Sequence, residues 1–137
     1  MIRLLNLDHV AVAVADLDQA VAEHARKYGT RPLYREVVEE QGVEEAMLPL
    51  GGSFLQLIAP LRPDSPVGRF IERNGPGLHH LAFTVPDIVD ALDHLRQEGA
   101  RLIDEQPRPG GRGALIAFVH PKDWSGTLIE LIQLPET

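Results

Sequence analysis

Cysteine is absent from this 137-residue chain, and aromatic residues make up only 5% of it. Without cysteine there is no disulfide framework and no thiolate metal site, so any metal would be held by histidine and oxygen ligands. No apolar run approaches the length of a bilayer span, and the N-terminus lacks the apolar region of a signal peptide. We therefore expect a soluble, cytoplasmic protein with no membrane partner.

A basic surface stripe is also missing. The formal net charge is −7, and the 13 lysines and arginines do not cluster with interleaved aromatic residues. Proteins that bind nucleic acid depend on such a patch to neutralise phosphates. We expect no nucleic-acid partner, and an anionic ligand would have to rely on local positive charge.

The main feature that is present is a duplicated motif. The segment LDHVAVAV at Leu7 to Val14 recurs as LHHLAFTV at Leu78 to Val85. His9 then aligns with His80 and Asp16 with Asp87, both at an offset of 71 residues. A unit of this size is too small to bury much core alone, so two copies are expected to pair around a shared sheet.

The predicted fold is α+β, with two paired βαβββ modules forming a curved mixed sheet around a metal site. Residues 1–137 would be a single domain made of two repeats, about 5–60 and 76–135, joined by a short helical segment at 61–75. The expected elements are strand 6–14, helix 17–29, strands 33–39, 43–50 and 53–59, helix 65–74, strand 78–85, helix 87–99, a short strand near 101–104, and strands 114–120 and 127–134.

Period-two alternation predicts which side chains share a face of the sheet. His9 shares its face with two alanines, and His80 shares its face with Ala82 and Thr84. The opposite faces of both strands carry bulky apolar residues, which the helices should cover. Both histidines would then lie on the face with the smaller residues, where there is room for a cavity.

Two further polar residues occupy equivalent places in the last strand of each copy. Gln56 lies in SFLQLIAP and Glu130 in TLIELIQL, where an uncompensated polar group would be costly to bury. Taken singly, each histidine fits an ordinary core residue, and Gln56 and Glu130 fit solvated strand residues. Together the four could converge as two imidazoles, one amide oxygen and one carboxylate, a ligand set suited to a divalent ion.

In these motifs the chain resembles the methylmalonyl-CoA epimerases of the vicinal oxygen chelate superfamily. The resemblance covers nearly the whole length. It is carried by LDHVAVAV, EEQGVEEAML, LQLIAPL with DSPVGRFIERNG, GLHHLAF, and AFVHPKDWSGTLIELIQ. Paired βαβββ units fit the whole superfamily, whereas the EQGVEEA segment and the ending are more particular to the epimerases. A more polar pair would be expected where this chain has Ala114 and Leu115.

The resemblance implies roles for particular residues. His9, Gln56, His80 and Glu130 would be the metal ligands, with His80 chosen from the HH pair because it aligns with His9. Glu45, in EQGVEEA, would be a catalytic base. The resemblance also suggests cobalt as the divalent ion, with Mn2+, Ni2+, Zn2+ or Mg2+ as the other candidates, and a homodimer.

The implied reaction interconverts (2R)- and (2S)-methylmalonyl-CoA, a small-molecule acyl-CoA substrate. A proton is removed and returned at the carbon between the thioester and the carboxylate, through a metal-stabilised enolate. Burial of Glu45 on the strand face it shares with Met47 would raise its pKa toward that of a useful base. Inversion needs a second group, for which Glu130 and a metal-activated water are both candidates.

Three alternatives share the fold. A glyoxalase I-type lactoylglutathione lyase uses a similar metal on the same sheet, but the EQGVEEA segment argues against it. A metal-free drug-binding resistance protein is disfavoured because all four candidate ligands are present. An extradiol dioxygenase would place a 2-His-1-carboxylate iron site within one half of the chain.

Overall fold

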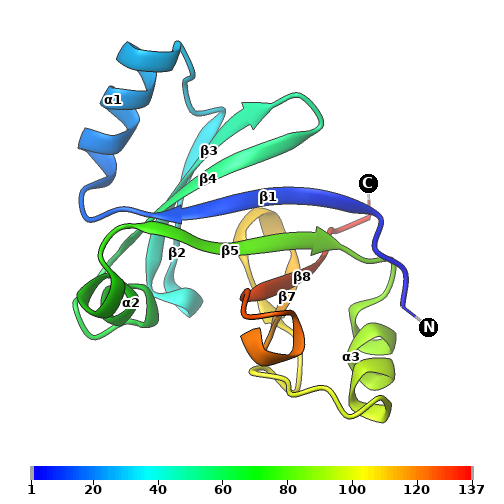
Figure 1. The fold of residues 1–137 in the computed structure, drawn as a ribbon. Helices are drawn as coiled ribbons and strands as arrows, with labels where there is room; N and C mark the ends of the chain where they lie inside the picture. The colour runs from blue at the N-terminus through cyan, green and yellow to red at the C-terminus, as the bar shows by residue number, and fades with distance from the viewer. Residues whose placement is uncertain (1, 137) are drawn as a thin grey trace. The chain divides into compact units, whose positions relative to one another are not determined.

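The computed structural model describes residues 2–136, and within them the chain forms eight strands and three α-helices (Figure 1). In chain order these are β1 Asn6–Ala13, α1 Leu17–Tyr28, β2 Tyr34–Val38, β3 Val43–Leu50, β4 Ser53–Pro60, α2 Pro66–Asn74, β5 Gly77–Thr84, α3 Ile88–Gln97, β6 Arg108–Pro109, β7 Leu115–Val119 and β8 Ile129–Gln133. The βαβββ order predicted for each copy is confirmed.

The described chain divides into two compact units. The first-repeat unit is His9–His79, and the second-repeat unit combines residues 2–8 with residues 80–136. Within the first-repeat unit the strand order is β2-β3-β4-β1, and within the second-repeat unit it is β5-β8-β7-β6. In each, the first strand pairs in parallel with the last and the other pairs are antiparallel, so both sheets are mixed as predicted.

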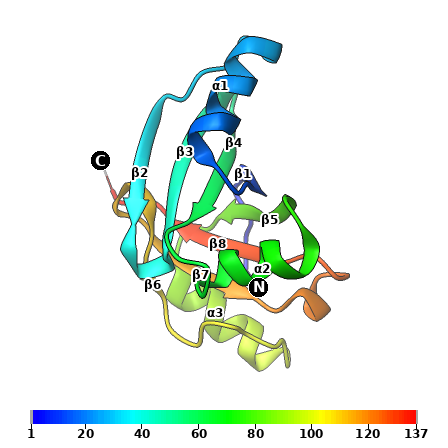
Figure 2. The ribbon, with the colours of Figure 1, turned by 90° about the vertical axis from the view of Figure 1, so that its left-hand side faces the viewer.

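Helix α1 covers the bulky face of the first-repeat sheet, alongside β3 and β4 (Figure 2). Leu17 is buried against Leu48 and Leu57, with Val12 packed at the edge of the same cluster. His9 alternates with Val10 and Val12 along β1, so its side chain belongs to the opposite face. Helix α1 therefore covers the face opposite His9, as predicted, but α2 packs Val67 against Ala11 and Ala13 on the histidine face.

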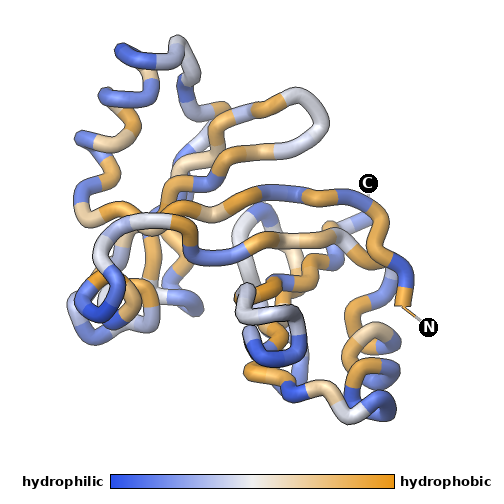
Figure 3. The backbone as a smooth tube through the Cα atoms, in the orientation of Figure 1, coloured by the Kyte–Doolittle hydropathy of each residue, from blue (hydrophilic) through white to orange (hydrophobic). Residues whose placement is uncertain are grey.

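The second-repeat unit repeats this arrangement. Helix α3 buries Ile88 and Leu92 against Ile129 and Leu131 of β8, on the bulky face. His80 again lies on the other face. Figure 3 shows the corresponding pattern in the backbone, where α1 and α3 alternate between hydrophilic and hydrophobic residues. This alternation is typical of helices that bury one side only.

The duplicated aspartates begin the two equivalent helices. Asp16 Oδ1 accepts a hydrogen bond from the Gln19 backbone N–H at 3.0 Å, and Asp87 Oδ1 accepts one from the Asp90 N–H at 3.1 Å. Each aspartate satisfies a backbone donor that the first helical turn leaves free. The matching Asp in the two motifs is therefore explained by helix capping.

Helix α2 belongs to the first-repeat unit and packs against β4. Ser65 caps its N-terminus by accepting a hydrogen bond from the Gly68 N–H at 3.2 Å, and Pro66 occupies the first turn, as predicted. Gly68 is required by close approach, since a Cβ atom there would contact the carbonyl oxygens of Pro63 and Arg62, the latter at 2.7 Å. The glycine therefore lets the helix lie against the preceding turn.

The strand predicted near 101–104 is wrong. Only Leu102 makes an isolated bridge, with Val119, and the strand that pairs with β7 is Arg108–Pro109. The Asp104 side chain accepts the backbone N–H of Phe118 at 2.8 Å, so a carboxylate replaces the ladder partner there. No helix among residues 2–136 is long and apolar enough to cross a membrane.

Candidate active site

The strand register places the predicted ligands in equivalent positions in the two units. In the first-repeat unit Ala11 pairs with Gln56, two residues beyond His9. In the second-repeat unit Ala82 pairs with Glu130, two residues beyond His80. Paired residues share a face of a sheet. Each unit therefore presents one histidine and one polar residue from its last strand on the face opposite its first helix, α1 or α3.

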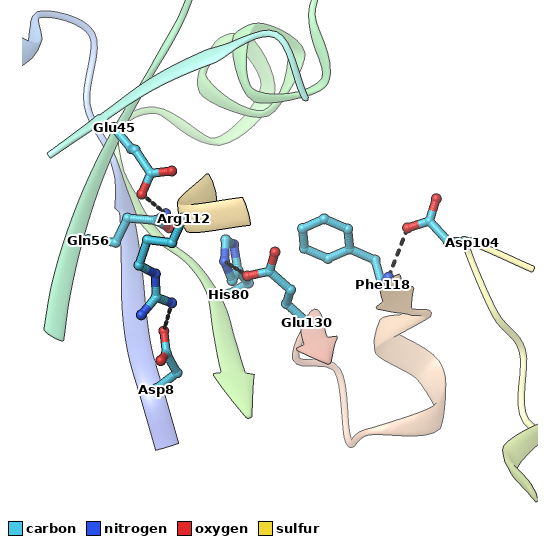
Figure 4. Close-up of polar contacts among 8 residues, drawn as sticks. All are labelled: Asp8, Glu45, Gln56, His80, Asp104, Arg112, Phe118 and Glu130. Carbon is cyan, nitrogen blue, oxygen red and sulfur yellow. Dashed lines mark hydrogen bonds and ion pairs between the residues drawn. The ribbon is translucent and has the colours of Figure 1, made fainter. Parts of the chain in front are cut away.

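His80 and Glu130 are in direct contact within the second-repeat unit. His80 Nε2 lies 3.1 Å from Glu130 Oε1, and both side chains are about 5% exposed or less (Figure 4). Phe118 meets the His80 ring edge-on, with the ring centroids 5.3 Å apart. Ligand atoms that bind one ion at about 2.1 Å lie roughly 3 Å from each other, so this pair fits two ligands of a metal.

Glu45 and Gln56 form the corresponding buried pair in the first-repeat unit. Gln56 Nε2 donates to Glu45 Oε2 at 3.0 Å (Figure 4). The other amide atom, Gln56 Oε1, is buried and has no hydrogen-bond partner among residues 2–136. A buried acceptor without a partner is costly. A bound cation would give Gln56 Oε1 the partner that it lacks, as the ligand role for Gln56 requires. The residues present therefore fit a metal.

The structure separates the two neighbouring glutamates of the EQGVEEA segment. Glu45 is 4% exposed and lies on the face shared with Met47 and Gln56. Glu44 points the other way and forms an ion pair with Arg35 at 3.2 Å on the surface. The predicted orientations of both side chains are confirmed, and only Glu45 is on the face with the candidate ligands.

His9 is 3% exposed, which matches the burial of His80 and Glu130. His9 belongs to the first-repeat unit and His80 and Glu130 to the second, so their union in one ligand set of two imidazoles and one carboxylate stays a prediction. His79, the first histidine of the HH pair, is instead partly exposed and packs edge-on against Phe70 of α2, with ring centroids 4.7 Å apart.

Several residues near these positions were not singled out by the sequence analysis. Asp8, directly before His9, forms an ion pair with Arg112 at 2.5 Å within the second-repeat unit (Figure 4). Phe118 gave no signal because an apolar residue in a strand is ordinary. Thr84 was placed on the His80 face, but its buried hydroxyl could not be recognised as unpartnered without coordinates.

The basic loop 107–113 proves to be tied to acidic partners. Arg108 forms an ion pair with Asp104 at 3.2 Å and its guanidinium lies 5.8 Å from the centre of the Phe118 ring. Arg112 binds Asp8. Lys122, in the loop after β7, is exposed. No phosphate contact is assigned to any of them.

Comparison with known proteins gives the same family as the sequence motifs. Residues 8–118 match the Glyoxalase/Bleomycin resistance protein/Dioxygenase superfamily. An ethylmalonyl-CoA/methylmalonyl-CoA epimerase of Cereibacter sphaeroides is 36% identical over 131 residues, covering 94% of this chain and 98% of that protein. The chain belongs to the methylmalonyl-CoA epimerase family. The resemblance predicted from its motifs is therefore confirmed, and so is the fold that the methylmalonyl-CoA epimerase family implies.

Solved structures of methylmalonyl-CoA epimerases agree with the fold over almost the whole chain. A Streptomyces coelicolor methylmalonyl-CoA epimerase variant in complex with 2-nitronate-propionyl-CoA superposes with a TM-score of 0.93 at 40% identity, covering 98% of both chains. A second methylmalonyl-CoA epimerase, in complex with methylmalonyl-CoA and NH4+, gives a TM-score of 0.91 at 41% identity, covering 96% of both chains.

Proposed function

We propose that this chain is a metal-dependent epimerase that interconverts (2R)- and (2S)-methylmalonyl-CoA. The proposal is carried chiefly by the buried His80–Glu130 pair, whose ligand atoms face each other at 3.1 Å in a chain of this family. The relatives named above as methylmalonyl-CoA epimerases match the chain along nearly its full length. A substrate thioester with a neighbouring carboxylate is the ligand chemistry that such a site would take.

The proposed metal ligands are His9, Gln56, His80 and Glu130. Bound there, a divalent ion would act as a Lewis acid toward the thioester and carboxylate oxygens. Among these ligands only Glu130 carries a formal negative charge, so the site keeps about one positive charge before substrate binds. The neutral amide of Gln56 preserves that charge, and its unpartnered Oε1 supports the ligand role. Cobalt is the ion proposed.

Glu45 is the proposed base that removes the proton from the carbon between the two carbonyl groups. Its carboxylate is 4% exposed, and it accepts the hydrogen bond from Gln56 Nε2 at 3.0 Å. That bond holds the carboxylate in place on the face it shares with Gln56, where it would meet the substrate. Because Gln56 would also hold the ion through Oε1, the base and the charge that favours proton removal are positioned by one side chain.

Glu130 is the proposed second group for returning a proton to the opposite face of the carbon. It is the other buried glutamate among residues 2–136, and its Oε1 lies 3.1 Å from His80 Nε2. Inverting the configuration of this carbon needs one group on each of its faces, which supports a role for Glu130 beside Glu45. The homodimer and the cytoplasmic location suggested by the sequence remain part of this proposal.

The deciding experiment is proton NMR of methylmalonyl-CoA in deuterated water, which follows exchange at the carbon between the two carbonyl groups. Wild type loaded with cobalt, the same protein after chelation, Glu45→Gln and Glu44→Gln would be compared. We expect rapid exchange that needs the metal. Exchange should fall by about 10²- to 10⁴-fold in Glu45→Gln, the range for loss of a general base.

Glu44→Gln is the matched control, because Glu44 is the adjacent glutamate of the same strand and lies on the surface with Arg35. It should exchange like the wild type. Absence of exchange in cobalt-loaded wild type would overturn the epimerase proposal. Conversion of a glutathione hemithioacetal by the same cobalt-loaded protein would then favour the glyoxalase I-type lyase.

A further inference from the structure

Thr84 carries a buried hydroxyl that the fold itself does not use. The residue is 6% exposed, and its Oγ1 has no hydrogen-bond partner anywhere in the described range 2–136. Its backbone is fully engaged, since its carbonyl accepts the Leu5 N–H at 2.9 Å. A hydroxyl taken out of water without a partner destabilises a folded protein, so this one is expected to serve a ligand.

The position of Thr84 in β5 places it beside the proposed metal ligands. His80, Ala82 and Thr84 alternate along one face of the strand. Ala82 pairs with Glu130 and Thr84 with Ile132, one step further along both strands. Along β5, Thr84 is therefore two residues, or roughly 7 Å, from Ala82, the cross-strand partner of Glu130.

The side chains around this hydroxyl are apolar. Ile132, its neighbour on β8, pairs in turn with Ile116 on β7, and both are about 2% exposed. With Ala82 and Ala114 they form one buried cluster of the second-repeat unit. None of these side chains can accept or donate a hydrogen bond. The next polar side chain along this row is Arg108 of β6, which pairs with Ile116 and forms an ion pair with Asp104.

The duplication shows that the strand does not need this hydroxyl. At the offset of 71 residues, the first-repeat counterpart of Thr84 is Ala13, which is fully buried on β1. The same strand position is therefore filled by an apolar residue in one copy and by a hydroxyl in the other. In the first copy this position packs in a cluster with Val67 of α2.

We propose that Thr84 donates a hydrogen bond to the substrate carboxylate, at the oxygen that the metal does not hold. This inference rests on the proposed function and identifies a residue that selects acyl-CoA esters with a second, free carboxyl group. A carboxylate with one oxygen on an ion still carries a second strong acceptor. In the apolar surroundings of Ile116 and Ile132, that acceptor needs a donor, and Thr84 supplies one.

The test measures binding of malonyl-CoA and propionyl-CoA to cobalt-loaded wild type, Thr84→Val and Thr84→Ser by calorimetry. Malonyl-CoA has the carboxylate and propionyl-CoA lacks it. We expect the Kd of malonyl-CoA to rise about tenfold in Thr84→Val, as for loss of a hydrogen bond to a charged group, while that of propionyl-CoA stays the same. Thr84→Ser keeps the hydroxyl and should bind both esters like wild type.

Thermal unfolding without ligand gives an independent measurement. Valine has nearly the shape of threonine, so Thr84→Val removes a buried unpartnered hydroxyl and should raise Tm by roughly 3 °C. Thr30→Val is the matched control, because the Thr30 hydroxyl, in the loop after α1, already donates to the Tyr28 carbonyl at 3.4 Å. It should change neither binding nor the preference for malonyl-CoA.

Equal Kd changes for the two esters in Thr84→Val, or no change for either, would overturn the carboxylate contact. Wild type that binds malonyl-CoA no more tightly than propionyl-CoA would overturn it as well. These outcomes are separate from failure of the proposed function, which appears as absence of proton exchange in the wild type. Wild-type exchange together with an unchanged Thr84→Val would reject this inference alone.

Discussion

The Gln56 side chain divides its two polar atoms between different tasks, donating from Nε2 to Glu45 Oε2 at 3.0 Å while its Oε1 is left buried without a partner. Both residues lie on neighbouring strands, β4 and β3, on the same face. A carboxylate in place of the amide could not donate to Glu45. The amide is therefore the residue type that can hold a base and offer an oxygen to a cation at once.

Replacing Gln56 by alanine should impair both tasks. We expect metal affinity to fall by about 10- to 100-fold, comparable to the loss of an orienting partner in a metal site, measured by cobalt titration. Proton exchange at saturating cobalt should still be at least about tenfold slower, because Glu45 loses the bond that orients it. Gln19→Ala, at an exposed glutamine of α1, is the control. Wild-type exchange once cobalt is saturating would show that Gln56 does not position Glu45.

The Asp8–Arg112 ion pair should contribute measurably to stability. It joins residues 104 positions apart, and the Asp8 side chain is only 7% exposed. Removing one partner leaves a largely buried charge, so Arg112→Ala should lower the free energy of unfolding by about 2–4 kcal/mol in urea denaturation. Arg35→Ala breaks more exposed ion pairs and should cost at most about 1 kcal/mol. Equal losses in the two variants would contradict the role assigned to Asp8.

Gly68 should not tolerate a methyl group. The added Cβ would overlap the carbonyl oxygens of Arg62 and Pro63, which belong to the backbone and cannot rotate away. We expect Gly68→Ala to lower the free energy of unfolding by about 1–3 kcal/mol, measured by denaturation, although alanine favours helices. Gly52→Ala has open space around the new atom and no positive φ, so its stability should stay within about 0.5 kcal/mol of wild type.

Asp123 should make the stability of the folded protein sensitive to acid. The Arg101 backbone N–H donates to its Oδ2 at 2.7 Å and holds the pKa of this carboxyl below its ordinary 3.8, with help from the Arg101 guanidinium. A lowered folded-state pKa stabilises the protein above the unfolded value, and this contribution is lost as pH falls through the folded value. Asp123→Asn should therefore lower Tm at pH 7, and the gap from wild type should narrow below about pH 4. A gap that is constant from pH 7 to pH 2 would contradict this.

The strands and helices were largely predictable because their signals are local. Alternation placed His9 and His80 on the faces opposite α1 and α3, and Asp16 and Asp87 marked the starts of these helices. The position of β6 was not predictable, because it depends on Asp104 binding the Phe118 backbone from 14 residues away. No periodicity carries information about a side-chain bond of that kind.

The candidate site shows the same division between local and long-range information. The duplication pointed to His9, Gln56, His80 and Glu130 together, since equivalent residues in two copies are far more informative than single ones. The Glu45–Gln56 hydrogen bond and the unpartnered Thr84 hydroxyl depend on side-chain geometry instead. Arg112 could not be matched with Asp8 from sequence, because nothing local relates residues at opposite ends of the chain.

The second-repeat unit includes residues 2–8, so the present gene no longer divides cleanly at the boundary of its duplication. Ile2 packs against the α3 cluster, Leu5 bonds to Thr84, and Asp8 binds Arg112. A fragment encoding only the second copy would lose all three contacts. The second-repeat unit is therefore built from both ends of the chain, and excising it as a transplantable building block would require residues 2–8 as well as residues 80–136.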